Sequence, residues 1–279
     1  LYKKQRPQLG DLPSKRGKTT FYNPSYSTAN SNAEIKKLFE NKKVFDYTKS
    51  MYLIKDFVSL ANTKPDDIIL DFFSGSATTA HAVMQLNAED GGNRRFIMVQ
   101  LPEKCEEESE AFKAGYKNIC EIGKERIRRA GEKIKAEHPD KDMDIGFRVL
   151  RIDSTNMKDV YYKPSDMTQE TLLDSIDNIK NDRTDLDLLF GVMVDCGLPL
   201  DMSIETKAID GKTYYVVNHG DLVACFEQDV PEKLIYEIAN MKPQCAVFRD
   251  SSFATAKDKV NVTEIFKNIT GRDDCVKVL

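Results

Sequence analysis

The stretch ILDFFSGSATTA, residues 69–80, constrains the fold more than any other part of the chain. An apolar run ends at Asp71, and small residues follow two phenylalanines. The run predicts a buried strand, and residues 78–89 have the pattern of a helix. A helix N-terminus exposes unpaired backbone N–H groups and a partial positive charge. Small residues at this turn would let a ligand approach the backbone closely, above all at Gly75.

The flanking pattern predicts an α/β fold. Apolar runs indicate strands at 67–73, 94–100 and 146–152, separated by helical stretches at 78–89 and 101–138, the latter broken near Gly115. Parallel strands that alternate with helices form half of a doubly wound sheet. Two further helices are expected upstream, a short one at 33–40 and one at 50–62 that Ser50 caps.

The character of the chain changes after residue 153, where a second, α+β domain is predicted. The domains expected are an extended N-terminal segment, 1–43, a ligand-binding part, 44–153, and the α+β domain, 154–279. A tight turn at Asn218 and Gly220 joins two of its strands. Its helices are expected at 168–181, 185–196, 231–240 and 261–270, and its strands at 202–209, 212–219, 221–227, 244–250 and 275–279.

Composition narrows the classes of function. The net charge is −4, which is unlike the strongly basic balance of a typical nucleic-acid-binding domain. The three His and six Cys lack metal-ligand spacing, so no metal site is expected. The Cys residues form no C-x-x-C pair and read as reduced thiols of a cytoplasmic protein. No apolar run approaches the roughly 18 residues of a membrane span.

The small-residue loop favours one kind of ligand. A dinucleotide site would need G-x-G-x-x-G and a phosphate-binding loop would need G-K-[ST], and neither is present. An acid at the strand end, Asp71, suits a ligand with an ammonium group and ribose hydroxyls, such as S-adenosylmethionine. The alternative is a tight packing turn that binds nothing.

At this point the sequence resembles a family. DFFSGSATT, 71–79, is similar to the D-x-F-x-G-S-G-T-T cofactor motif of amino-group DNA methyltransferases, and especially of the modification subunit of type III restriction–modification systems. Residues 44–58, 86–104 and 247–268 resemble other segments of that subunit. The resemblance implies a partial, Rossmann-like methyltransferase sheet and adenine-N6 methylation of double-stranded DNA. It also implies S-adenosylmethionine as cofactor, a restriction subunit as partner, and a homodimer.

The resemblance also implies which residues bind the cofactor. Ala77 stands where the family has a second glycine, and would cost on the order of 1 kcal/mol if that position needs positive φ. Either Gln100 or Glu103 would meet the ribose hydroxyls, and residues 44–58 would help cover the methionine end. The cofactor-binding residues expected are Phe45, Asp46, Lys49, Asp71, Phe73, Ser74, Gly75, Ser76, Thr78, Gln100 and Glu103.

The catalytic motif of this family, D-P-P-Y, does not occur in the chain, so no catalytic residue is assigned. Asn23-Pro24-Ser25-Tyr26 is a lookalike that could support a self-sufficient methyltransferase, although its polar flanks do not suit a base-flipping motif. The chain is interpreted as the C-terminal part of a longer enzyme, inactive alone. The alternative is a dimerisation or restriction-subunit interaction module with a vestigial loop. In either case the open edge of the first strand is expected to pair with another chain, to be covered by residues 1–45, or to cause self-association.

Overall fold

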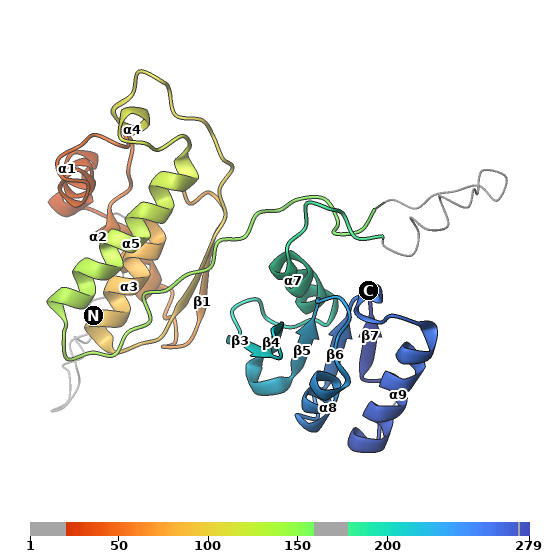
Figure 1. Ribbon diagram of the computed structural model, residues 1–279. Helices are drawn as coiled ribbons and strands as arrows, with labels where there is room; N and C mark the ends of the chain where they lie inside the picture. The colour runs from red at the N-terminus through yellow and green to blue at the C-terminus, as the bar shows by residue number, and fades with distance from the viewer. Residues whose placement is uncertain (1–20, 159–177, 273) are drawn as a thin grey trace, which may run out of the picture. The chain divides into compact units, whose positions relative to one another are not determined.

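The computed structural model describes residues 21–158, 178–272 and 274–279. The chain divides into two compact units, 1–147 and 148–279, which are both mixed α/β structures (Figure 1). No helix within the described residues is long and apolar enough to cross a membrane.

The first unit is built on two parallel strands, β1 (Ile68–Asp71) and β2 (Arg95–Met98), with Ile68 opposite Arg95 and Asp71 opposite Met98. The helix α3 (Thr78–Asp90) connects them and packs against α2 (Met51–Leu60) and α5 (Ile119–Glu137) (Figure 1). These bounds agree with the strands and helices expected from the sequence. The remaining helical elements are η1 (Pro24–Tyr26), α1 (Thr28–Leu38) and α4 (Glu110–Lys113).

Small side chains let α3 and α5 pack closely. Ala80, Met84 and Ala88 of α3 form one buried cluster with Ala130 and Ile134 of α5. Alanine combines high helix propensity with little bulk, so it suits a helix that is buried along most of its length. This packing fixes α3, whose first residue follows the small-residue loop directly.

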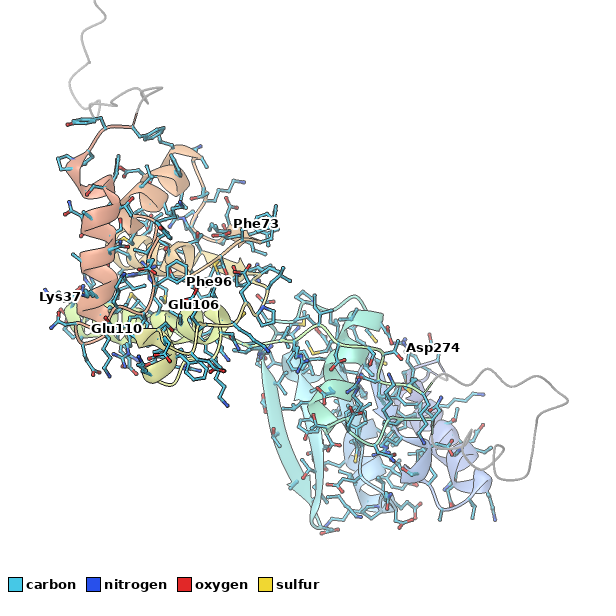
Figure 2. The ribbon with its side chains drawn as sticks, turned by 90° about the horizontal axis from the view of Figure 1, so that it is seen from above. Lys37, Phe73, Phe96, Glu106, Glu110 and Asp274 are labelled. Carbon is cyan, nitrogen blue, oxygen red and sulfur yellow. The ribbon has the colours of Figure 1, made fainter. Side chains whose placement is uncertain are left out.

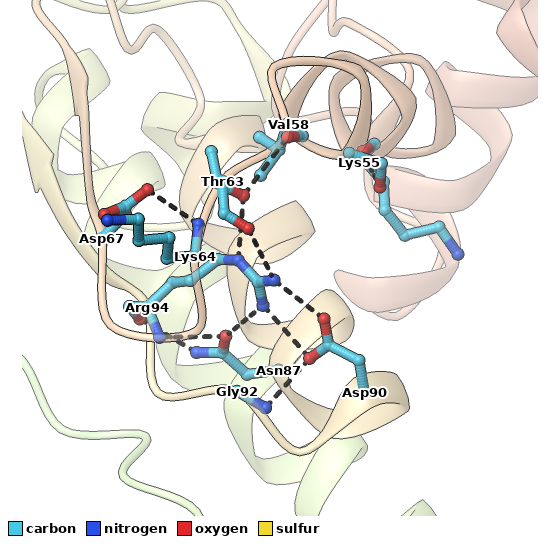
Figure 3. Close-up of polar contacts among 10 residues, drawn as sticks. Lys55, Val58, Thr63, Lys64, Asp67, Asn87, Asp90, Gly92 and Arg94 are labelled. Atoms are coloured by element: carbon cyan, nitrogen blue, oxygen red, sulfur yellow. Dashed lines mark hydrogen bonds and ion pairs between the residues drawn. The ribbon is translucent and has the colours of Figure 1, made fainter. Parts of the chain in front are cut away.

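Arg94 fixes the other end of α3. Its side chain is 8% exposed and forms an ion pair with Asp90 at 2.9 Å and a hydrogen bond to Thr63 Oγ1 at 3.0 Å (Figure 3). Asn87 donates to the backbone carbonyl of Arg94 at 2.9 Å and accepts from its N–H at 3.1 Å. The network therefore ties the C-terminus of α3 to the start of β2 and to the turn after α2.

Three predictions for this unit need correction. The strand expected at 146–152 does not form: Phe147 packs on the α3–α5 cluster, Ile152 is 96% exposed, and no described backbone hydrogen bond joins the segment to β2. Residues 101–109 are not helical: Lys104 forms an isolated antiparallel bridge with Asn118, and the Cys105 N–H bonds to the carbonyl of Lys117, so the segment is extended there. The helix expected at 33–40 begins earlier, at Thr28, because the Ser27 hydroxyl caps it.

The second unit contains a five-stranded sheet in the order β3-β4-β5-β6-β7. The first three strands are antiparallel, and β5, β6 and β7 are parallel. Asn218 and Gly220 have positive φ at the β4–β5 turn, as predicted. The strands are β3 (Ile204–Ile209), β4 (Lys212–Val217), β5 (Leu222–Cys225), β6 (Cys245–Phe248) and β7 (Val276–Val278).

Helices cover both faces of this sheet. α8 (Glu232–Asn240) and α9 (Ala256–Thr270) share one apolar cluster with one face, and α7 (Asp185–Asp195) shares another with the opposite face. α7 agrees with the prediction because a capping box at Thr184 sets its start. Most of the helix predicted at 168–181 lies outside the described residues.

Candidate functional site

The carboxylate of Asp71 organises the loop between β1 and α3. One of its oxygens accepts the N–H of Phe73 at 3.1 Å, and the other accepts the hydroxyl of Thr79 at 2.5 Å. Ser74 N–H donates to the carbonyl of Val99 at 3.2 Å, just beyond β2. The loop is therefore held from both strands of the sheet.

Two left-handed residues shape the turn. Gly75 has a φ of 52° and Ala77 a φ of 57°, so the position where Ala replaces glycine does require positive φ. An L-residue in this conformation costs roughly 1–2 kcal/mol. Ala77 is also the N-cap of α3 and has no side chain to accept a hydrogen bond, so α3 begins without a side-chain cap. Its N-terminal N–H groups and positive dipole end therefore suit an anionic group.

Two expected residues lie beside Gly75. The Oε1 atom of Gln100 accepts the Gly75 N–H at 2.7 Å, and the ring of Phe45 lies 3.8 Å from where a Cβ on Gly75 would be. Cys120 of α5 donates its thiol to the Gln100 carbonyl at 3.4 Å. Gln100 thus supports the loop as well as standing at the end of β2. Glu103 lies further on and is exposed, with its carbonyl accepting the N–H of Ile119 at the start of α5.

The upstream segment reaches the loop through a residue that sequence reasoning missed. Thr48 is 2% exposed, and its hydroxyl lies 3.1 Å from that of Ser76. The expected residues Asp46 and Lys49 are exposed, and Asp46 forms an ion pair with Lys43 at 2.5 Å. No hydrogen bond or ion pair described here joins Asp46 or Lys49 to the loop.

Arg126 of α5 is a second residue that sequence reasoning missed. It is fully buried, and its Nη1 atom lies within 2.9 Å of the hydroxyls of Thr48, Ser76 and Thr78. Burial lowers the pKa of Arg126 to about 10, so the guanidinium remains charged at neutral pH. A signal was present, because Arg126 lies four residues after Ile122 and so within the apolar stripe of the helix.

An apolar surface borders the loop. Phe73 is 83% exposed and projects outward from the first unit (Figure 2), and its ring centroid lies 5.5 Å from that of Phe72. Exposed aromatic rings of this kind can stack on a planar ligand group. The structure therefore places a polar backbone turn and an aromatic face side by side.

The lookalike Asn23–Tyr26 has a local structural role. Pro24–Tyr26 form the 3₁₀ helix η1, and the side chain of Asn23 accepts the N–H of Ser25 at 3.0 Å. Tyr26 donates its hydroxyl to Asp56 on α2. These groups are used to join η1 to α2 and do not end a buried strand.

Residues 3–132 match the N6/N4 methyltransferase family, described as DNA methylase. This match lies within the first unit and covers a little under half of the chain. The DNA methylase match covers β1, the small-residue loop, α3, β2 and most of α5, so it includes all the elements that build the site.

The chain is also similar to curated DNA-modifying proteins. It is 43% identical over 150 residues to the type III restriction-modification enzyme EcoPI Mod subunit of Escherichia phage P1, covering 54% of this chain and 23% of that protein. It is 41% identical over 161 residues to the StyLTI Mod subunit of Salmonella typhimurium, covering 57% and 22%. The EcoP15I Mod subunit of Escherichia coli is 39% identical over 120 residues, covering 43% and 17%.

The matched part of the chain spans less than a quarter of the length of these relatives. All three relatives are Mod subunits of type III restriction-modification enzymes, which agrees with the resemblance of the sequence motifs to that subunit. They do not favour the alternative of an interaction module with a vestigial loop.

Proposed function

We propose that this chain carries the S-adenosylmethionine-binding part of a DNA adenine-N6 methyltransferase, the modification subunit of a type III restriction–modification system. The observation that carries the proposal is the turn from Asp71 to Thr78. Positive φ at Gly75 and Ala77 turns the backbone directly into an uncapped helix, beside an exposed aromatic residue. The parallel unit β1–α3–β2 supports the finer expectation of a Rossmann-like, doubly wound sheet.

The residues present fit this cofactor. When bound, S-adenosylmethionine supplies an electrophilic methyl group on a sulfonium centre. The turn at Gly75 would approach its amino-acid end, Phe73 would contact its aromatic or apolar part, and Gln100 or Glu103 would meet its ribose hydroxyls. The work of this part of the enzyme is positioning, since holding reactants in the correct geometry lowers the barrier to transfer.

The remaining parts of the proposal follow from the relatives. Double-stranded DNA is the proposed substrate and a restriction subunit the proposed partner, because the Mod relatives belong to restriction-modification enzymes. A homodimer and a cytoplasmic location are also proposed. No residue of this chain is assigned a catalytic role, so the chain alone is expected to bind the cofactor without transferring methyl groups.

Calorimetric titration with S-adenosylhomocysteine, the demethylated cofactor, tests the proposal. The wild-type chain should give saturable heat. Gly75→Val should abolish it, because a branched side chain would fill the turn. Gly91→Val is the matched control: Gly91 also has positive φ, at the other end of α3, and has open space around it. An absence of heat for the wild-type chain at millimolar ligand contradicts the proposal.

A further inference from the structure

The buried guanidinium of Arg126 lies directly behind the loop. Its Nη1 atom is 2.7 Å from Thr78 Oγ1, 2.9 Å from Ser76 Oγ and 2.9 Å from Thr48 Oγ1. One nitrogen with two hydrogens cannot serve three acceptors fully, so one of these bonds is shared. Arg126 thereby joins the loop, the upstream segment and α5 at a single atom.

Gly123, about one helical turn before Arg126 on α5, also packs closely against the loop. A Cβ at Gly123 would lie 3.4 Å from the Gly75 carbonyl oxygen and 3.5 Å from the Ala77 Cβ. Any side chain larger than alanine at Gly123 would therefore displace the turn. Gly123 and Arg126 together give α5 a face that follows the shape of the loop.

The positive charge of Arg126 has little local compensation. Its Nε and Nη2 atoms have no hydrogen-bond partner within the described part of the chain. Glu34 of α1 attracts the guanidinium electrostatically, but no hydrogen bond between them is described, and burial raises the pKa of that carboxyl group. The other nearby groups are Lys133, a second cation, and His81, which burial keeps neutral.

A buried charge without a bonded counterion is costly, so its position matters. Arg126 donates to Ser76 and Thr78, which flank the N-cap of α3, where the helix dipole is also positive. The charge of Arg126 and the dipole of α3 therefore add. Both act through the protein interior, where electrostatic interactions are stronger than in water. The positive potential at this turn therefore favours an anionic ligand group.

We propose that Arg126 is a positioning residue that holds Ser76 and Thr78 from behind and, through its charge, draws the carboxylate of the cofactor's amino-acid end to the N-terminus of α3. The inference rests on the proposed function. The carboxylate is the one anionic group of S-adenosylhomocysteine, and 5′-methylthioadenosine has the same nucleoside without the amino-acid end. Comparison of the two ligands therefore separates the amino-acid end, with its carboxylate, from the nucleoside.

The test measures the affinity of both ligands calorimetrically for the full chain and for Arg126→Met, which keeps the apolar volume without the charge. We expect the affinity for S-adenosylhomocysteine to fall by about three- to thirtyfold, as for loss of a favourable, partly buried charge at a helix N-terminus. The affinity for 5′-methylthioadenosine should change much less. Arg126→Lys should recover most of the loss, and Arg128→Met, on the exposed side of the same helix, should have no effect.

An equal loss for both ligands, or no loss for either, overturns the inference. A wild-type chain that binds neither ligand contradicts the proposed function instead. Glu34→Gln provides a second test that does not depend on the folding of the Arg126 variants. Removal of this carboxylate should tighten S-adenosylhomocysteine severalfold and leave 5′-methylthioadenosine unchanged, and an unchanged affinity for both also overturns the inference.

Discussion

Ala77 adopts a left-handed backbone while its methyl group is buried between α3 and α5, so two opposing effects meet at one residue. Replacement by glycine relieves roughly 1–2 kcal/mol of backbone strain and loses about 0.8 kcal/mol of methyl burial. The sequence predicted that alanine would be strained at this position if the turn has positive φ, but it did not show whether the turn has positive φ.

We expect Ala77→Gly to change the free energy of unfolding of the first unit by less than about 1 kcal/mol, in the stabilising direction. Ala80→Gly, in the interior of the same helix, should destabilise by about 1.5–2 kcal/mol, because it loses burial and helix propensity without relieving strain. Urea-dependent hydrogen exchange of α3 amides measures both values. Equal destabilisation by the two substitutions would show that Ala77 is not strained.

His81 gives the first unit a pH dependence. Its side chain is buried, and desolvation, with Arg126 and Lys133 nearby, lowers its pKa to about 3. Because the folded-state pKa is below that of the unfolded chain, the stability from neutral His81 is complete above pH 6.5 and is lost as pH falls toward about 3. The raised pKa of Glu34 acts in the opposite direction over acidic pH.

The contribution of His81 between pH 7 and pH 5 should be on the order of 2 kcal/mol of unfolding free energy. The His81→Gln variant should lose less stability than the wild type over this interval, since glutamine does not titrate. His138→Gln, at the C-cap of α5, is the control. The same hydrogen-exchange measurement at the two pH values decides the matter, and parallel losses in wild type and His81→Gln would refute this role.

The turn from Asp71 to Thr78 was predictable, because the acid at the strand end and the small residues that follow are visible in the sequence. The burial of Arg126 was not predictable from residue type, since a charged residue on a helix is normally exposed. Its role depends on three segments that are separated by up to 78 residues and that meet only in the folded chain.

At the scale of elements, the β1–β2 pair has one apolar face that the described residues of the first unit leave uncovered. Ile68, Leu70 and Ile97 are each about half exposed, and Phe72 and Leu101 extend the same surface. The apolar side chains of residues 35–45 pack elsewhere, in a cluster with α4 and α5, and Phe21 packs against Phe57 of α2. Exposed apolar patches of this kind mark interaction surfaces or promote association.

We expect the chain to self-associate through this face. The double substitution Leu70→Lys and Ile97→Lys should shift the weight-average mass toward the monomer, because charges on a flat apolar strand oppose pairing. Val260→Lys, at an exposed position on α9 of the second unit, is the control. Sedimentation velocity over a concentration series gives the answer, and a wild-type chain that stays monomeric throughout would contradict the expectation.

Helices with clear capping signals were predictable from the sequence. The third strand was predicted at 146–152 but does not form. Ser50 is a good N-cap residue, and its hydroxyl accepts the Leu53 N–H at 3.3 Å as expected. The apolar run at 146–152 has the composition of a buried strand, but composition does not reveal whether a partner edge is available. In this chain Phe147 packs on helices instead, which removes the segment from the sheet.

At the scale of the whole molecule, the described residues of each unit form their own apolar clusters, two in the first unit and two in the second. A ligand that binds one folded unit stabilises that unit by mass action. The two halves of the chain should therefore respond separately to the proposed cofactor.

We expect S-adenosylhomocysteine to raise the urea midpoint for loss of hydrogen-exchange protection in α3 and to leave that of β5 unchanged. Both elements can be followed in one experiment on the full chain by mass spectrometry. The Gly75→Val variant, with its turn filled, should show no shift in either. A common midpoint that moves together for α3 and β5 would show a single cooperative unit.

The link between Arg126 and Ser76 spans 50 residues of sequence. The chain is synthesised from its N-terminus, so the glycine turn leaves the ribosome well before the side chain that secures it. A nascent chain interrupted before α5 would thus contain the whole segment from Asp71 to Thr78 yet lack the contacts that α5 makes with it. Translation must pass through α5 before this segment can acquire its final geometry.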